Sequence, residues 1–117
     1  MLMEQKFPEA VHYLNEAARH GQFWIIYRHL TIAYTQLHQP QQAVEAFDKA
    51  YRLNPAVVGD KGALDAAARS LVVLGNYRAA DGAIKLLLNA NPAAGSDLEI
   101  QQTEQLIQKK LQGEPQK

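Results

Sequence analysis

Apolar residues recur every three or four positions along most of the chain, which is the spacing of amphipathic α-helices. The clearest stretch runs from Trp24 to Pro55. Its apolar positions form two sets, Trp24, Tyr27, Leu30, Ala33, Tyr34 and Leu37 in the first half and Ala43, Val44, Phe47, Ala50 and Tyr51 in the second. A turn at His38 separates the halves, and Pro40 can open the second because the first residue of a helix needs no N–H donor. Asn54 ends the stretch, since the residue before a proline avoids the helical conformation. The pattern predicts a hairpin of two short helices.

A second hairpin is predicted after Asp60, which is a suitable N-cap residue. Five identities recur at one offset of 37 residues: Leu37 and Leu74, Ala43 and Ala80, Ala46 and Ala83, Asn54 and Asn91, and Pro55 and Pro92. This register predicts one helix over 61–74 and another over 77–90. Gly82 lies inside the second of these helices, where glycine costs about 1 kcal/mol relative to alanine.

The two ends of the chain each add one predicted helix. Ala10, Val11 and Ala17 precede Ala43, Val44 and Ala50 by 33 residues, so a helix from Pro8 to His20 matches the second helix of a hairpin whose first helix is missing. At the other end, Ser96 with Glu99 three residues later forms a capping-box pattern, which predicts that the last helix starts at Ser96. This last helix is mostly polar, as expected of a helix that caps a stack, and the alternative is that it docks a partner.

The residues of the first hairpin resemble the tetratricopeptide repeat (TPR) family, whose pattern covers about 34 residues. The positions that carry the resemblance are Tyr27, Leu30, Ala33, Tyr34, Ala43, Phe47, Ala50 and Pro55. The second hairpin departs from the pattern, with Leu71 for the usual Tyr, Asp81 for the usual Val or Ile, and Leu87 for a small residue. Its three extra residues fit best in the connection at 57–59. The resemblance implies an all-α fold, a short right-handed superhelix of about six helices in antiparallel hairpins with a C-terminal capping helix.

The expected organisation is a single TPR-like domain over residues 1–117. Its parts are a half repeat at 7–21, repeats at 24–57 and 61–94, and a capping helix at 96–112. The half repeat leaves the apolar side of its helix without the usual cover, so a homodimer is a possible partner state.

Composition and motifs narrow the function classes. Lys and Arg number 12 and Asp and Glu number 12, so the formal net charge is zero, which disfavours binding to duplex nucleic acid. The chain has no cysteine, no apolar run of signal-peptide or membrane-span length, and none of the common catalytic motifs. The four histidines are not spaced as metal ligands. We therefore expect a cytoplasmic protein that is not an enzyme, with no catalytic or metal site, no cofactor, and no nucleic-acid or membrane partner.

The family resemblance also implies a binding surface, because first-helix residues of such repeats line a concave groove. The corresponding candidate residues are Ile25, Arg28, His29, Ile32, Thr35 and Gln36 in the first repeat, and Asp65, Arg69, Val72 and Val73, beside Gly62 and Ala66, in the second. Apolar side chains there would supply affinity, and Arg28 and Arg69 could each hold a carboxylate. The other interpretation is that the two isoleucines pack on the preceding helix and the two arginines are solvated.

Two functions follow from these features. The first is a non-enzymatic scaffold for protein binding, which holds a peptide or protein segment of unknown identity in the concave groove. The alternative is a structural subunit that self-associates, or joins a larger complex, through the bare first helix and the segment from Leu86 to Leu88.

Overall fold

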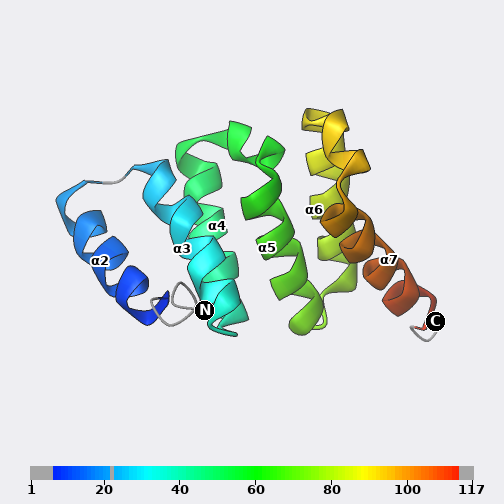
Figure 1. Cartoon of the computed structure of the whole chain (residues 1–117), viewed down its shortest axis with the longest axis horizontal. Helices are drawn as coiled ribbons and strands as arrows, with labels where there is room; N and C mark the ends of the chain where they lie inside the picture. Colours follow the sequence, from blue (N-terminus) through cyan, green and yellow to red (C-terminus); the bar gives the residue numbers. More distant parts are fainter. Residues whose placement is uncertain (1–6, 22, 114–117) are drawn as a thin grey trace.

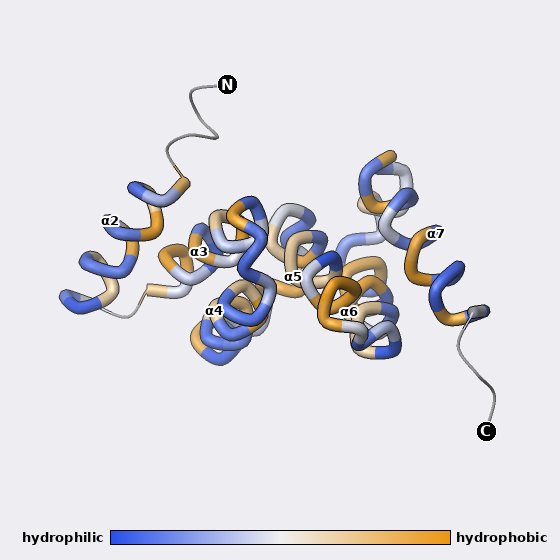
Figure 2. The backbone as a smooth tube through the Cα atoms, turned by 90° about the horizontal axis from the view of Figure 1, so that it is seen from below, coloured by the Kyte–Doolittle hydropathy of each residue, from blue (hydrophilic) through white to orange (hydrophobic). Residues whose placement is uncertain are grey.

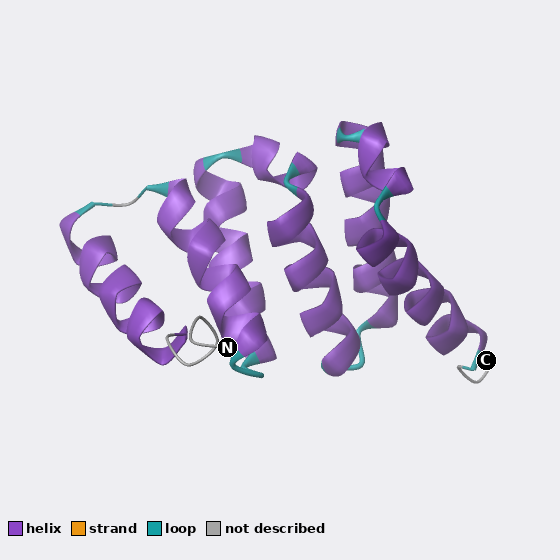
Figure 3. Ribbon diagram, in the orientation of Figure 1, coloured by secondary structure: helices purple, strands orange, loops and turns teal. Residues whose placement is uncertain are grey.

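The helices follow one another in chain order along the longest axis of the molecule (Figure 1). The computed structural model describes residues 7–21 and 23–113, and this part of the chain is all-α, with no strand (Figure 3). The α-helices are α2 (Phe7–His20), α3 (Trp24–Gln36), α4 (Pro40–Leu53), α5 (Lys61–Val73), α6 (Tyr77–Ala90) and α7 (Leu98–Gln112). Among these helices, none has the length and apolarity that crossing a membrane requires.

The two hairpins have matching bounds, which confirms the register of 37 residues predicted from the sequence. Helix α3 begins at Trp24 and α5 at Lys61, while α4 begins at Pro40 and α6 at Tyr77, so each start shifts by 37 (61 − 24 and 77 − 40). Helix α7 starts at Leu98, a further 37 residues after α5 (98 − 61). In the register of 37 residues, α7 therefore corresponds to the first helix of a third hairpin.

The connections after the hairpins are ordered 3-10 helices. These are η1 (Pro55–Gly59) and η2 (Pro92–Ser96), which again lie 37 residues apart (92 − 55). Each buries one apolar side chain, Val57 in η1 and Ala94 in η2. The three extra residues that the sequence placed in this connection are thus part of a packed turn, since Val57 joins the core.

The turn inside each hairpin requires one residue with a left-handed backbone. His38 has a φ of 59° between α3 and α4, and Gly75 has a φ of 81° between α5 and α6. These residues are also 37 apart, so the same turn is built with histidine once and glycine once. Glycine adopts this conformation without the steric penalty that a Cβ brings.

The start of α7 corrects one prediction. Ser96 is not the N-cap, because its hydroxyl donates to the carbonyl oxygen of Ala93 within η2. Asp97 caps the helix, with Oδ1 accepting from the backbone N–H groups of Glu99 and Ile100. The predicted capping box is therefore wrong by one residue. Asp60 caps α5 in the same way, accepting from the N–H of Ala63.

The core is continuous through the hairpins and is made largely of small and branched apolar residues. Helix α3 packs on α4 around Tyr27 and Leu30, and α5 packs on α6 around Leu64. Helix α7 contributes Ile100 and Ile107, whose exposed fractions are 2% and 0%. Hydrophobic positions alternate with hydrophilic ones along the helices in Figure 2, as amphipathic helices require.

The two ends of the stack differ. Helix α2 has no fully buried residue and packs on α3 through the partly buried Val11, Leu14 and Ala18. On α5, Leu64, Ala68 and Leu71 face the core. The residues that follow them by 37 positions, on α7, are the glutamines Gln101, Gln105 and Gln108. All three glutamines are exposed, so the outer face of α7 is largely polar, although Leu98 and Leu106 on the same helix are exposed as well.

Candidate functional site

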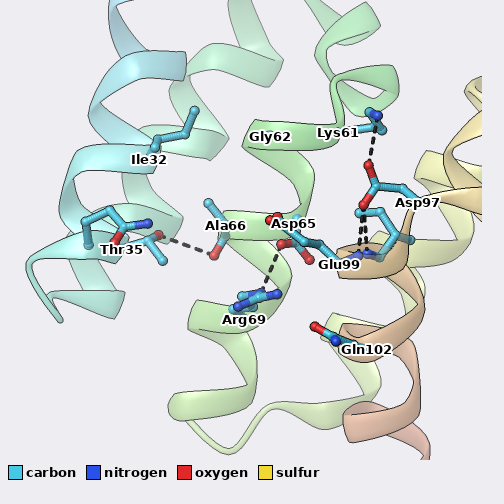
Figure 4. Close-up of a pocket in the computed structure, with 12 residues that line it drawn as sticks. Ile32, Thr35, Lys61, Gly62, Asp65, Ala66, Arg69, Asp97, Glu99 and Gln102 are labelled. Atoms are coloured by element: carbon cyan, nitrogen blue, oxygen red, sulfur yellow. Dashed lines mark hydrogen bonds and ion pairs between the residues drawn. The ribbon is translucent and has the colours of Figure 1, made fainter. Parts of the chain in front are cut away.

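A cavity of about 530 Å³ opens between α3, α5 and α7 (Figure 4). The three helices that correspond to one another in the 37-residue register, α3, α5 and α7, thus share one concave surface. Its lining residues are Ile32, Thr35, Gln36, Lys61, Gly62, Asp65, Ala66, Arg69, Asp97, Glu99, Ile100 and Gln102. The volume is within the range of ligand sites in proteins, roughly 300–1,000 Å³.

Hydrogen bonds of Thr35 join α3 to α5 on the floor of the cavity. Its hydroxyl lies 2.8 Å from the carbonyl oxygen of Thr31 and 3.3 Å from that of Ala66. It also lies 3.1 Å from the hydroxyl of Ser70. Because these bonds satisfy Thr35 internally, this residue positions the helices more than it offers a free group to a ligand.

A network of three side chains joins α5 to α7. The Nε of Arg69 lies 2.9 Å from Oδ2 of Asp65 and 3.1 Å from the hydroxyl of Thr103, which itself donates to Oδ1 of Asp65 at 2.6 Å. Burial raises the pKa of Asp65 above its ordinary value, and this effect outweighs the opposing hydrogen bond from Thr103 and the charge of Arg69. Asp65 is therefore a buried carboxylate that depends on both partners.

A second ion pair joins the start of α5 to the start of α7. The Nζ of Lys61 lies 2.9 Å from Oδ2 of Asp97. The hydrogen bond from Lys61 is the main cause that lowers the pKa of Asp97, and backbone N–H groups of α7 add to it. Asp97 thus has two roles, since one oxygen caps α7 and the other binds Lys61.

Arg28 lies beside the cavity and is also engaged. Its Nε lies 2.6 Å from Oδ2 of Asp60, the N-cap of α5, with both side chains about one quarter exposed. Burial acts to raise the pKa of Asp60, but the hydrogen bonds from Arg28 and the backbone prevail and lower it. A Cβ added at Gly62 would lie 3.4 Å from Nη2 of Arg28, so glycine lets α3 and α5 approach closely here.

The structure brings together half of the ten candidate residues predicted from the sequence. Those that line the cavity are Ile32, Thr35, Gln36, Asp65 and Arg69. His29 and Ile32 line a neighbouring hollow, and Val73 lines a third one together with Arg69. Ile25 lines none of these hollows and is 41% exposed. Arg28 is bound to Asp60, as described above, and is not freely solvated.

Val72 does not belong to the concave surface. Its side chain is 8% exposed and packs in the core with Ala68, Ile84 and Ile107. The position that faces the groove in the resembling family faces α6 and α7 here, so the prediction for this residue is corrected.

Sequence reasoning missed the contribution of α7 and of the first residue of α5. These residues are Lys61, Asp97, Glu99, Ile100 and Gln102. The register contained a signal for them, since Asp97 follows Asp60 by 37 residues and Gln102 follows Asp65 by 37. The sequence leaves open whether the last helix caps the stack or docks a partner, and in the structure α7 forms one wall of the concavity.

Three polar side chains in the cavity have no hydrogen-bond or ion-pair partner in the described part of the chain: Gln36, Glu99 and Gln102. They come from the two opposite walls, α3 and α7, and are exposed. Such groups can exchange bonds with water for bonds with a ligand without breaking an internal contact. Within residues 7–21 and 23–113, no three His, Asp or Glu side chains gather as a metal site would require.

Compared with family models, curated proteins and solved structures, the chain matches none of them. Function is therefore inferred from the concavity between α3, α5 and α7. Ion pairs within the protein occupy most of the charged side chains in and beside it, while two amide groups and one carboxylate of the described residues remain free to bind a ligand.

Proposed function

We propose that this chain is a non-enzymatic interaction module of the TPR type, which holds a segment of another protein in the concavity between α3, α5 and α7. The observation that carries the proposal is the open cavity of about 530 Å³ with free polar groups on two facing walls. Glutamine side chains at Gln36 and Gln102 suit a peptide ligand, because an amide can donate to a backbone carbonyl and accept from a backbone N–H.

The neighbouring hollows favour an extended or helical segment over a compact small molecule. A hollow of about 320 Å³ between α2 and α3 shares Ile32 with the cavity. A hollow of about 290 Å³ near the α3–α4 turn shares Thr35, Gln36 and Arg69 with it. One polypeptide segment could contact all three, with side chains entering successive hollows.

The ion pairs support a binding role more than a catalytic one. Asp65 and Asp97 are each within 2.9 Å of a cation and each receives a further hydrogen bond. Carboxylates held in this way fix the spacing of α5 and α7, which keeps the concave surface in one shape before a partner arrives. A preformed surface reduces the entropy that binding would otherwise cost.

The test uses a block of the concavity and a matched control on the same helix. Gln102→Trp places a large side chain in the cavity, whereas Gln105→Trp makes the same change on the outer face of α7. Peptides selected on the unaltered protein from a displayed library of random linear sequences should lose affinity at least about tenfold with Gln102→Trp, or about 1.4 kcal/mol. They should bind the Gln105→Trp variant unchanged. Equal binding to both variants would move the site away from the concavity.

Self-association is a second candidate, because large apolar side chains are exposed on α2 and α6, outside the cavity between α3, α5 and α7. Tyr13 on α2 is 69% exposed and Leu86 on α6 is 54% exposed. Sedimentation equilibrium tests this function. A dimer in the unaltered protein that Tyr13→Glu or Leu86→Glu dissociates would support it, and a monomer at high protein concentration would exclude it.

A further inference from the structure

The concave surface is chemically different at its two ends. Next to α2, the hollow that shares Ile32 is lined mainly by apolar side chains, Phe7, Ala10, Tyr13, Leu14, Ile32 and Ala33, with His29 as the other residue. Next to α7, the lining of the cavity includes charged and amide side chains, those of Lys61, Asp97, Glu99 and Gln102, beside the apolar Ile100. A segment lying along the concave surface would therefore meet an apolar end and a polar end.

The polar end carries an excess of negative charge. The charged residues of the cavity are two bases, Lys61 and Arg69, and three acids, Asp65, Asp97 and Glu99. Each base lies 2.9 Å from one acid, which leaves the carboxylate of Glu99 without a partner among the described residues. Burial is the main cause of the raised pKa of Asp65, and the negative charge of Glu99 adds to it. The negative charge of Glu99 is therefore felt by Asp65, another carboxylate that lines this cavity.

The arginines do not reverse this balance. Arg69 uses Nε for both Asp65 and Thr103, and its positive charge is compensated by the carboxylate at 2.9 Å. The side chain of Arg28 lies close to Gly62, and its positive charge is compensated in the same way by the carboxylate of Asp60 at 2.6 Å. An acidic ligand would have to compete with these internal carboxylates, whereas a basic ligand would find Glu99 unoccupied.

We infer that the segment held in the concavity carries a basic side chain, Lys or Arg, that pairs with Glu99, together with an apolar side chain that fills the hollow between α2 and α3. This inference rests on the proposed function and adds the chemistry of the partner. Charge complementarity at Glu99 sets the orientation of the segment, since its basic residue must lie toward α7 and its apolar residue toward α2.

The test selects a displayed library of random linear peptides on two proteins, the unaltered chain and the Glu99→Lys variant. Glu104→Lys serves as the matched control, because it makes the same charge change on α7 at a residue outside the cavity. Peptides from the unaltered protein should be enriched both in Lys or Arg and in large apolar residues. Their affinity should fall about tenfold with Glu99→Lys and stay within about twofold with Glu104→Lys. Selection on Glu99→Lys should favour Asp or Glu instead.

The outcomes separate this inference from the proposed function. Some selected peptides could be blocked by Gln102→Trp and yet be acidic, lack an apolar residue or bind Glu99→Lys unchanged. Such peptides would overturn the inference and leave the proposed function intact. The absence of any peptide that Gln102→Trp blocks would overturn both. Glu99→Gln keeps the size of the side chain, and the selected basic peptides should bind it more weakly than the unaltered protein. Unchanged binding to Glu99→Gln would also overturn the inference.

Discussion

The fold gives a sharp prediction at two glycines that differ only in backbone conformation. Gly82 lies within α6, and Gly75 lies in the α5–α6 turn with a φ of 81°. A Cβ added at either position would meet no atom within 4 Å. The same change to alanine therefore adds no contact and causes no clash at both sites, so that only the backbone decides its effect.

The expected effects have opposite signs. Gly82→Ala should stabilise the protein by about 1 kcal/mol, which is the difference in helix propensity between glycine and alanine. Gly75→Ala should destabilise it by about 1 kcal/mol or slightly more, because alanine in the left-handed region brings its Cβ close to the following carbonyl oxygen. For a chain of this size, each change corresponds to a shift in Tm of about 4 °C.

The assay is urea and thermal unfolding followed by far-ultraviolet circular dichroism, with both variants measured beside the unaltered protein. Linear extrapolation with an unchanged slope would show that stability, and not the compactness of either state, has changed. Stabilisation by Gly75→Ala, or destabilisation by Gly82→Ala, would refute the assignment of these residues to a left-handed turn and a helix interior.

Further predictions concern α7 and the cavity. Ile107→Ala should cost about 3 kcal/mol in urea unfolding because Ile107 is fully buried, and a cost below about 1 kcal/mol would mean that α7 does not complete the core. Asp97→Ala should lower Tm more than Ser96→Ala does, because Asp97 caps α7 and binds Lys61 whereas Ser96 donates one exposed hydrogen bond to Ala93, and the reverse order would restore Ser96 as the cap. Because burial raises the pKa of Asp65, its protonated form favours folding fully below the ordinary value of 3.8, and this contribution is lost as pH rises through the folded value. The stability of Asp65→Asn relative to the unaltered protein should therefore increase with pH between about pH 3 and pH 7 in thermal unfolding, and a decrease over that window would contradict the raised pKa.

The helices could be predicted from the sequence because their apolar spacing and the register of 37 residues are both local signals. Each of the helices α2 to α6 begins or ends within a residue or two of its predicted bound. The start of α7 was missed because Ser96 and Glu99 imitate a capping box. The register would have selected Asp97, which follows the N-cap Asp60 by 37 residues, and that long-range signal is the better guide here.

The candidate site was less predictable because partners in space decide what a charged side chain can do. Arg28 and Arg69 read from the sequence as free cations, yet each is bound to an aspartate. The spacing of four residues on one helix indicates the pair of Asp65 and Arg69, whereas the sequence alone does not place Asp60 beside Arg28. Replacing them would weaken the joints between helices, so they are poor residues with which to test binding. The free groups, Glu99 and Gln102, come from α7, whose second role as a wall appears only when the helices are stacked.

The most direct test of the binding surface is a nuclear magnetic resonance titration of the labelled protein with a peptide selected on it. The proposed function predicts that backbone N–H signals of Thr35, Gly62, Ala66 and Gln102, which line the cavity, shift together and saturate with one affinity. Signals of Tyr51 and Leu53, which are exposed on α4 outside the cavity, should stay in place. Shifts confined to α4, or to the outer face of α7, with no change at Gly62 and Ala66, would contradict the concavity as the site of binding.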